Sequence, residues 1–237
     1  MSKVVILSGA GISAESGIST FRDSGGLWEE YKIEEICTAG CMQTNRDKTI
    51  EFYDKRRLDL KDKKPNHAHL VIKELQARYP NDISIITQNV DDLFEKAGCQ
   101  DVMHLHGFLP EIRCQECHSI YNIGYQKQNE AMSQCSKCQG SLRPNIVFFG
   151  EMAPKYRDMY QELQDCMMLV VIGTSGNVID TDMFLSPYFK KEPIRYSILN
   201  NLEPSSAIDD SLYTKVLYKK ATEAIDEIAK DIDEFLD

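Results

Sequence analysis

The sequence predicts an α/β fold: a parallel sheet with helices on both faces, accompanied by a smaller domain of helices and a zinc-ribbon segment. Three observations support this prediction. Short apolar runs alternate with amphipathic helical patterns along the chain, which is typical of a parallel sheet covered on both faces. The first run ends in a glycine-rich turn, as in nucleotide-binding folds. A separate segment has two C-x-x-C pairs and few large apolar residues, so it needs a cross-link such as a bound metal ion or disulfides in order to fold.

Four short apolar runs have the length and composition of buried parallel strands. They are Val4–Leu7, Ile83–Thr87, Leu169–Ile172 and the weaker Ile194–Leu199. A helix is expected after Pro65-Asn66, because apolar residues recur at helical spacing from there to Tyr79. A second helix is expected at the end of the chain, where the same spacing runs from Ala224 to Phe235.

Two segments interrupt this alternation. The stretch from Gly25 to Leu60 has helical patterns without a strand, and the stretch from Arg113 to Arg143 carries the C-x-x-C pairs. We therefore expect a single core with two lobes. The large lobe comprises about residues 1–24, 66–112 and 144–237, and the small lobe about residues 25–65 and 113–143. A cleft between lobes is a common place for a ligand.

The net charge of the chain limits the classes of partner that it can bind. The 237 residues include 27 Lys and Arg against 37 Asp and Glu, a net charge of −10. This argues against binding nucleic acid or an anionic membrane by bulk electrostatics, and it is compatible with lysine-rich protein partners. No run reaches the eighteen or so apolar residues of a membrane-spanning helix, and the amino terminus has too short an apolar run for a secretory signal. A cytoplasmic protein is expected, in which the eight cysteines are thiols or metal ligands rather than disulfides.

The glycine turn from Gly9 to Ala14 fits the pattern G-x-G-x-x-G/A. Its glycines permit a tight turn and a close approach to a pyrophosphate, and a helix that begins there offers N–H groups to phosphate oxygens. A turn without a ligand is the alternative. The acid that binds ribose in dehydrogenases is expected about 20 residues on, after a strand. Glu29 and Glu30 have this spacing but follow Gly25-Gly26-Leu27-Trp28, which favours nucleotide binding over hydride transfer.

Four cysteines have the spacing of a zinc ribbon. Cys114 and Cys117 form one C-x-x-C pair, Cys135 and Cys138 form the other, and 17 residues separate the pairs. Four thiolates close the tetrahedral shell of one zinc ion and leave no position for water, so the zinc should be structural. A redox pair and two disulfides are the alternatives. The remaining cysteines show no pairing pattern and are interpreted as ordinary thiols: Cys37, Cys41, Cys99 and Cys166.

Two polar segments offer candidate site residues. Gln88, Asn89 and Asp91 follow an expected strand, at the sheet edge where ligands bind in open α/β folds, although Asn89 or Asp91 could instead cap a helix. His104 and His106 lie just before the zinc segment. An imidazole suits a general base, and only one of the two histidines is expected to face a ligand site. Gly107 leaves room beside His106, which favours that histidine over a structural role for both.

Seven motifs occur in one order along the chain. They are GAGIS from Gly9, GISTFR from Gly17, TQNVD from Thr87, HLHG from His104, the two C-x-x-C pairs, PNIVFFGE from Pro144 and GTS from Gly173. This series resembles the sirtuins, a family of NAD-dependent protein-lysine deacylases. The resemblance runs from about Leu7 to Asn200 and leaves almost no extension beyond such a catalytic core.

The resemblance implies a Rossmann-like domain with a parallel sheet, a zinc-bearing small domain, and a cleft in which NAD and peptide meet. It implies that the NAD phosphates and ribose are held by Gly9, Ala10, Gly11, Phe21 and Arg22. The ribose and nicotinamide pocket would be lined by Gln88, Asn89 and Asp91, and the adenosine end by Gly173, Ser175 and Asn200. His106 would be the catalytic base, and Asn89 would position water and cofactor.

The implied reaction joins the acyl group to the cofactor. The acyl-lysine carbonyl oxygen attacks C1′ of the nicotinamide ribose as nicotinamide leaves, and His106 then takes a proton from a ribose hydroxyl that attacks the acyl carbon. The products are free lysine, nicotinamide and O-acyl-ADP-ribose. The substrate peptide would add as a strand between two edges. These edges are Val147, Phe149 and Gly150 on one side and Gly176 and Val178 on the other.

One sequence element indicates which acyl groups the substrate carries. Tyr53 and Arg56 are similar to the Tyr-x-x-Arg element of sirtuins that prefer acidic acyl groups. On a helix they share a face, and a guanidinium with a phenol can bind a carboxylate. Succinyl- and malonyl-lysine are therefore expected substrates, with acetyl-lysine also accepted. A surface helix with solvated arginines is the alternative.

The sequence is also compatible with other functions. Within the same chemistry the protein could be primarily a deacetylase or a mono-ADP-ribosyltransferase. An NAD-dependent oxidoreductase and a zinc-ribbon binding module without catalysis are candidates from other classes. The expected partners are acyl-lysine side chains of proteins, with no membrane and no direct nucleic-acid binding, and the protein is expected to be a monomer.

Overall fold

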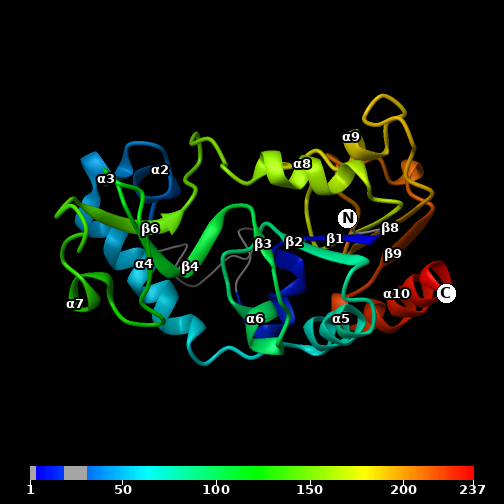
Figure 1. Ribbon diagram of the computed structural model, residues 1–237, viewed down its shortest axis with the longest axis horizontal. Coiled ribbons are helices and arrows are strands. Elements are labelled where there is room, and N and C mark those ends of the chain that lie inside the picture. Colours follow the sequence, from blue (N-terminus) through cyan, green and yellow to red (C-terminus); the bar gives the residue numbers. More distant parts are fainter. Residues whose placement is uncertain (1–3, 19–30) are drawn as a thin grey trace.

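A parallel sheet of six strands forms the centre of the computed structural model, which describes residues 4–18 and 31–237 (Figure 1). The strand order is β3-β2-β1-β7-β8-β9. The strands are β1 Val4–Ser8, β2 Ile83–Thr87, β3 Met103–His104, β7 Met168–Ile172, β8 Tyr196–Asn201 and β9 Lys215–Tyr218. In the middle of the sheet Ile6 lies opposite both Ile85 and Val170. The predicted α/β fold with a parallel sheet is confirmed.

Helices cover both faces of this sheet. Figure 1 shows α5 (His67–Arg78) and α10 (Ala221–Leu236) on one face and α8 (Tyr156–Gln164) on the other. Successive residues of β1 point to opposite faces, so Val4 and Ile6 join the core under α5 and α10 while Val5 and Leu7 join the core under α8. The short helices α6 (Leu93–Ala97), α9 (Asp182–Leu185) and η3 (Asp210–Leu212) occupy the connections. No helix in the described parts of the chain is long and apolar enough to cross a membrane.

The segment after β1 differs from the expected helix. It consists of two short 3₁₀ turns, η1 (Ala10–Ile12) and η2 (Ala14–Ser16). Side-chain amides of Asn89 and Asn66 donate to the carbonyls of Gly9 and Ile12, at 3.1 and 2.8 Å. These carbonyls would otherwise accept the hydrogen bonds of a continuing α-helix, and Gly17 ends the second turn in the left-handed region at φ 77°.

A second, antiparallel sheet lies beside the first, with strand order β5-β4-β6. Its strands are β4 Gly107–Cys114, β5 Ile120–Asn122 and β6 Leu142–Ile146. Figure 1 shows this sheet together with α2 (Ile33–Ile36), α3 (Cys41–Thr44), α4 (Arg46–Leu60) and α7 (Gln128–Ala131). The apolar face of α4 packs on Leu109, Ile146 and Phe148, so one core joins the helical segment to the sheet that carries the cysteines.

Candidate functional site

The glycine turn after β1 packs directly on the loop after β7. The N–H of Gly9 donates to the Ile172 carbonyl and that of Gly11 to the Gly173 carbonyl, both at 2.9 Å. A Cβ on either Gly9 or Gly11 would lie 2.7 Å from a backbone atom of Gly173. The glycines are therefore required by the contact between two loops, in addition to any ligand. The backbone amides of Gly9 and Gly11 donate hydrogen bonds within the protein, whereas the Ala10 amide donates to no described residue.

Asn89 and Asp91 reach the glycine turn from the end of β2. The Asn89 amide donates to the Gly9 carbonyl and to the Ser13 hydroxyl, both at 3.1 Å. Ser13 in turn donates to the Asp91 carboxylate at 3.0 Å, and burial raises the pKa of Asp91. Asp91 also accepts from the Leu93 amide at 3.1 Å, at the start of α6, whose N-cap is Asp92, so Asp91 contacts both the helix start and the glycine turn. Ser13 was not singled out from the sequence, although it belongs to the glycine motif.

Gln88 and Asn200 both lie at the carboxyl-terminal ends of strands, Gln88 after β2 and Asn200 in β8. The side-chain amides of both residues have partners in the fold. Gln88 donates to the Thr174 hydroxyl at 2.9 Å. Asn200 donates to the carbonyls of Leu217 and Lys219, each at 2.9 Å, and so holds β9 against β8. Ser175 lies in the loop after β7, where its carbonyl accepts from the Ser205 hydroxyl at 2.6 Å. The expected residues of the adenosine end thus gather where β7 and β8 end.

His104 and His106 differ in the partner of Nε2. Nδ1 of His106 donates to the Gln88 carbonyl at 3.0 Å, and its Nε2 lies 3.0 Å from the Tyr156 hydroxyl. Nδ1 of His104 donates to the Asn89 carbonyl at 2.9 Å, and its Nε2 lies 2.8 Å from the Glu95 carboxylate. His106 therefore presents an Nε2 lone pair that can accept a proton, whereas both nitrogens of His104 face acceptors.

The pKa values of the two imidazoles move in opposite directions. Burial lowers the pKa of His106, and the hydrogen bond to the Gln88 carbonyl opposes this. For His104, burial lowers the pKa, but the hydrogen bond and charge of Glu95 outweigh it and the pKa is raised. A neutral imidazole at neutral pH is the form needed by a general base. Of the two histidines, His106 has the chemistry of a base.

The segment after β6 pairs with residues that precede α3. Val147 donates to the His106 carbonyl at 2.9 Å, which fixes the segment beside the imidazole. Phe149 donates to the Cys37 carbonyl and accepts from the Ala39 amide, both at 2.8 Å. One side of this expected peptide edge is thus already paired within the chain, and Gly150 follows it with φ +85°.

The other expected peptide edge lies in the loop after β7. Val178 is 53% exposed, so its side chain is accessible to a partner. A Cβ on Gly176 would lie 2.6 Å from Ile208 and 2.8 Å from the Ala207 carbonyl, so a glycine is required there by the neighbouring loop.

Tyr53 and Arg56 share one face of α4, as their spacing predicts. The Arg56 guanidinium carbon lies 5.9 Å from the centre of the Tyr53 ring. The Tyr53 hydroxyl donates to the Cys37 thiol at 3.4 Å, and the Tyr53 ring lies 5.8 Å from that of Phe148. Burial raises the pKa of the Cys37 thiol, while Tyr53 and the nearby Arg56 charge oppose the shift. This pair therefore lies next to the segment of Phe148 and Phe149.

The four predicted zinc ligands converge. Their sulfur atoms all lie within 4.8 Å of one another, with 3.5 Å between Cys114 and Cys138 and between Cys117 and Cys135. Four sulfurs around a zinc ion at about 2.3 Å are separated by about 3.8 Å, so this cluster fits one structural zinc ion. All eight cysteines are free thiols in the structure, and Cys37, Cys41, Cys99 and Cys166 are buried away from the cluster.

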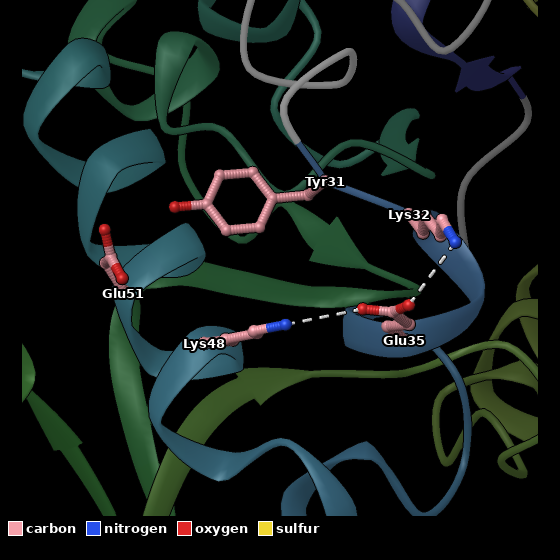
Figure 2. Close-up of a pocket in the computed structure, with 5 residues that line it drawn as sticks. All are labelled: Tyr31, Lys32, Glu35, Lys48 and Glu51. Atoms are coloured by element: carbon pink, nitrogen blue, oxygen red, sulfur yellow. Dashed lines mark ion pairs between the residues drawn. The ribbon is translucent and has the colours of Figure 1, made fainter.

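An open depression on the helical part of the molecule lies apart from these residues. It is lined by Tyr31, Lys32, Glu35, Lys48 and Glu51. Figure 2 shows Glu35 between Lys32 and Lys48, at 3.9 and 3.7 Å. Glu51 pairs with Lys55 at 3.3 Å, so every charged group that lines the depression already has a partner of opposite charge. Two residues expected to hold the cofactor, Phe21 and Arg22, lie outside the described residues.

Comparisons with known proteins agree on one family. The Sir2 family model matches residues 9–180. An NAD-dependent protein deacylase of Campylobacter jejuni strain RM1221 is 46% identical over 237 residues, covering all of this chain and 98% of the relative. A protein with the same name from Helicobacter hepaticus is 40% identical over 254 residues, covering 99% of each chain.

Solved structures give the same result. A Sir2 homologue with a serine-to-alanine substitution, in complex with ADP-ribose, superposes with a TM-score of 0.84 at 33% identity, covering 98% of this chain and 92% of the other. A Sir2 homologue in complex with NAD superposes with a TM-score of 0.83 at 33% identity, covering 99% and 90% of the two chains. Sequence and fold therefore lead to the same group of proteins.

Proposed function

The chain belongs to the Sir2 family and is an NAD-dependent protein deacylase, and from this premise we propose that it prefers succinyl- and malonyl-lysine while also accepting acetyl-lysine. The observation that supports this preference is the position of Arg56 over the Tyr53 ring, beside the segment of Phe148 and Phe149. A guanidinium binds a carboxylate through strong, charge-assisted hydrogen bonds. A neutral acetyl group gains nothing from that charge.

The surroundings of Tyr53 suit a recognition role. The ring is buried, with 2% of its surface exposed, and packs against Phe52 and Phe148. Among the described residues its hydroxyl donates to a weak acceptor, the Cys37 thiol, at 3.4 Å, and a carboxylate can replace this thiol as a stronger acceptor. Burial raises the pKa of Tyr53, so the phenol keeps the proton that it would donate to an acidic acyl group.

The proposed catalytic base is His106. When bound, NAD supplies the ADP-ribosyl group that accepts the acyl group, and nicotinamide, free lysine and O-acyl-ADP-ribose are the products. His106 accepts a proton at Nε2 because its Nδ1–H is held by the Gln88 carbonyl. Asn89 contributes by fixing Ser13 and the glycine turn, and Val147 keeps the peptide edge beside the imidazole.

The remaining assignments follow the sequence motifs. We assign the phosphates and ribose of NAD to Gly9, Ala10 and Gly11 with Phe21 and Arg22, and the ribose and nicotinamide pocket to Gln88, Asn89 and Asp91. The adenosine end is assigned to Gly173, Ser175 and Asn200, and the peptide edges to Val147, Phe149 and Gly150 and to Gly176 and Val178. The amide of Ala10, which donates to no described residue, is the donor of the turn best placed for a phosphate oxygen.

Mass spectrometry of one peptide in two acylated forms tests the proposal. The same lysine carries a succinyl or an acetyl group, and each form is incubated with and without NAD. We expect both forms to lose the acyl group only with NAD, with a higher kcat/KM for the succinyl form and release of nicotinamide. A higher value for the acetyl form would make the protein primarily a deacetylase. Transfer of ADP-ribose to protein, or reduction of the nicotinamide, would replace the proposal by another reaction.

A further inference from the structure

We propose that the Tyr156 hydroxyl holds His106 in its proton-accepting tautomer, and that a ribose hydroxyl of NAD replaces Tyr156 at Nε2 when the cofactor binds. Tyr156 is the first residue of α8 and lies 50 positions from His106 along the chain. The inference rests on the proposed function, in which His106 is the base. It assigns to Tyr156 the role of a positioning residue, since its hydroxyl contacts the base.

The hydrogen bonds determine which nitrogen carries the proton. The Gln88 carbonyl can only accept, so Nδ1 of His106 carries hydrogen and donates to it at 3.0 Å. Nε2 is then an acceptor in the neutral imidazole, and the Tyr156 hydroxyl at 3.0 Å donates to it. Burial raises the pKa of Tyr156, with a contribution from Tyr160, so the phenol keeps the proton that this contact uses.

Nε2 has a single lone pair in the plane of the ring. It accepts one good hydrogen bond at a time, so the Tyr156 O–H and a substrate O–H compete for it. Before NAD binds, the phenol donates and the imidazole is held in one orientation. After the exchange, the substrate hydroxyl donates to Nε2, which is the arrangement from which a general base takes a proton.

His104 shows what a different partner does at the same position. Its Nδ1 also donates to a main-chain carbonyl, but its Nε2 faces the Glu95 carboxylate at 2.8 Å, and its pKa is raised. A carboxylate stabilises the protonated imidazole, which is useless as a base, whereas a phenol O–H stabilises the neutral form. A contact with the Tyr156 hydroxyl therefore favours the neutral form of His106. Because the phenol can be displaced, the Nε2 lone pair stays available to a substrate hydroxyl.

The position of Tyr156 permits the exchange. The residue is only half-buried, and Met152 in the segment before it is 92% exposed. The effects on the pKa of His106 are burial and the hydrogen bond to the Gln88 carbonyl, and no charged side chain of the described residues contributes. The hydroxyl is thus the one titratable group in contact with the ring within the described parts of the chain.

Nitrogen-detected NMR titration of the imidazoles tests the contact without turnover. The protein has five histidines, and the signals of His106 are those absent from His106→Ala. We expect the Nδ1–H tautomer in the wild type, and in Tyr156→Phe a pKa of His106 higher by about half a unit, because the donor to the neutral form is gone. Tyr160→Phe, one turn further along α8, is the matched control and should leave the titration as in the wild type. An unchanged pKa in Tyr156→Phe would overturn the proposal.

Calorimetry of NAD binding tests the exchange. Because the ribose hydroxyl no longer has to displace a phenol, Tyr156→Phe should bind NAD about two- to fivefold more tightly, while Tyr160→Phe binds as the wild type. Equal or weaker binding in Tyr156→Phe contradicts the exchange, provided that its melting temperature is that of the wild type. If the wild type removes no acyl group from any peptide, the proposed function fails, yet the two measurements on Tyr156 still decide this inference.

Discussion

His104 and His106 donate through Nδ1 to the carbonyls of two consecutive residues, Asn89 at 2.9 Å and Gln88 at 3.0 Å. The two imidazoles are thus anchored in the same way to the end of β2 but differ in the partner of Nε2. This relationship makes His104 a matched comparison for every test of His106.

Replacement of His106 by alanine removes the proposed base. We expect His106→Ala to lower kcat for deacylation by about 10²- to 10⁴-fold, the usual contribution of general acid–base catalysis, with the fold intact. The corresponding change at His104 removes the contact to Glu95 and should cost far less activity. Steady-state rates with an acylated peptide measure both variants, and circular dichroism verifies folding. Comparable loss in the two variants would refute the assignment of the base to His106.

The pH dependence of the reaction follows from the burial of His106. Since burial lowers the pKa of this imidazole below its ordinary value of 6.5, the neutral form predominates at pH 7 and above. We expect kcat/KM for NAD to be level in this range and to fall as the pH drops through a value below 6.5, where the base becomes protonated. A rate profile at saturating peptide measures this limb. A midpoint above 6.5 would contradict the lowered pKa.

The sequence predicted the parts of the fold that have a local signal. Val4–Leu7 and Ile83–Thr87 are recognisable as strands because they are short and predominantly apolar, and both lie inside the sheet. β9 was missed because it begins at Lys215, lies at the edge and ends at the exposed Tyr218. The glycine turn was recognised by its pattern, but the expected helix after it was wrong.

The site was predictable only in part, for a related reason. Spacing identified the zinc ligands and the shared face of Tyr53 and Arg56, because both are properties of short segments. The contact of Gly11 with Gly173 and that of His106 with Tyr156 join segments far apart in sequence. No periodicity of the chain reports such a contact, so these two relationships required the structure.

Arg56 is expected to act in substrate recognition, whereas its neighbour Arg57 is expected to stabilise the fold. We expect Arg56→Met to raise the KM for succinyl-lysine by roughly 10- to 100-fold, the equivalent of a lost hydrogen bond between charged groups, and the KM for acetyl-lysine by about twofold or less. Steady-state kinetics on the two acylated forms of one peptide measure the ratio. An equal effect on both substrates would argue against a carboxylate partner at Arg56.

Arg57 provides the contrast for this test. Its side chain is fully buried, pairs with Asp54 at 2.6 Å and donates to the Leu109 carbonyl at 2.8 Å. Arg57→Met leaves the Asp54 carboxylate without its cation, so we expect a loss of roughly 3–5 kcal/mol in the free energy of unfolding. Urea denaturation measures this loss. Arg56→Met should unfold at nearly the wild-type urea concentration, because Arg56 is only partly buried.

Loss of one zinc ligand should unfold the three-stranded sheet. Cys114, at the end of β4, and Cys135 lie in a small core that has few other members, so the metal supplies most of its stability. We expect Cys135→Ser, or a strong chelator, to remove the zinc and to lower the melting temperature by roughly 10 °C or more. Cys99→Ala, at a buried thiol elsewhere, should keep one zinc per chain. Full zinc content or unchanged melting in Cys135→Ser would contradict a structural site.

His69 should make the protein less stable in mild acid. Its side chain is fully buried, Nδ1 donates to the Asn66 side chain at 3.0 Å, and Nε2 has no partner among the described residues. Burial lowers the pKa of His69 to about 4, whereas an unfolded histidine has a pKa of about 6.5. Between these values the unfolded chain binds a proton that the folded chain does not. The free energy of unfolding therefore falls as the pH drops from 6.5 to 4, by roughly 3 kcal/mol in all from this residue.

Urea denaturation at a series of pH values measures the contribution of His69 as a difference between variants. His69→Gln keeps a donor toward Asn66 but cannot titrate, so the fall in stability between pH 6.5 and pH 4 should be smaller in this variant than in the wild type. His67→Gln is the matched control, because His67 is half exposed and pairs with Asp226 on the surface. It should retain the wild-type fall. If His69→Gln lost stability with decreasing pH as steeply as the wild type, the acid sensitivity would arise from other groups, and the buried neutral imidazole would have no part in it.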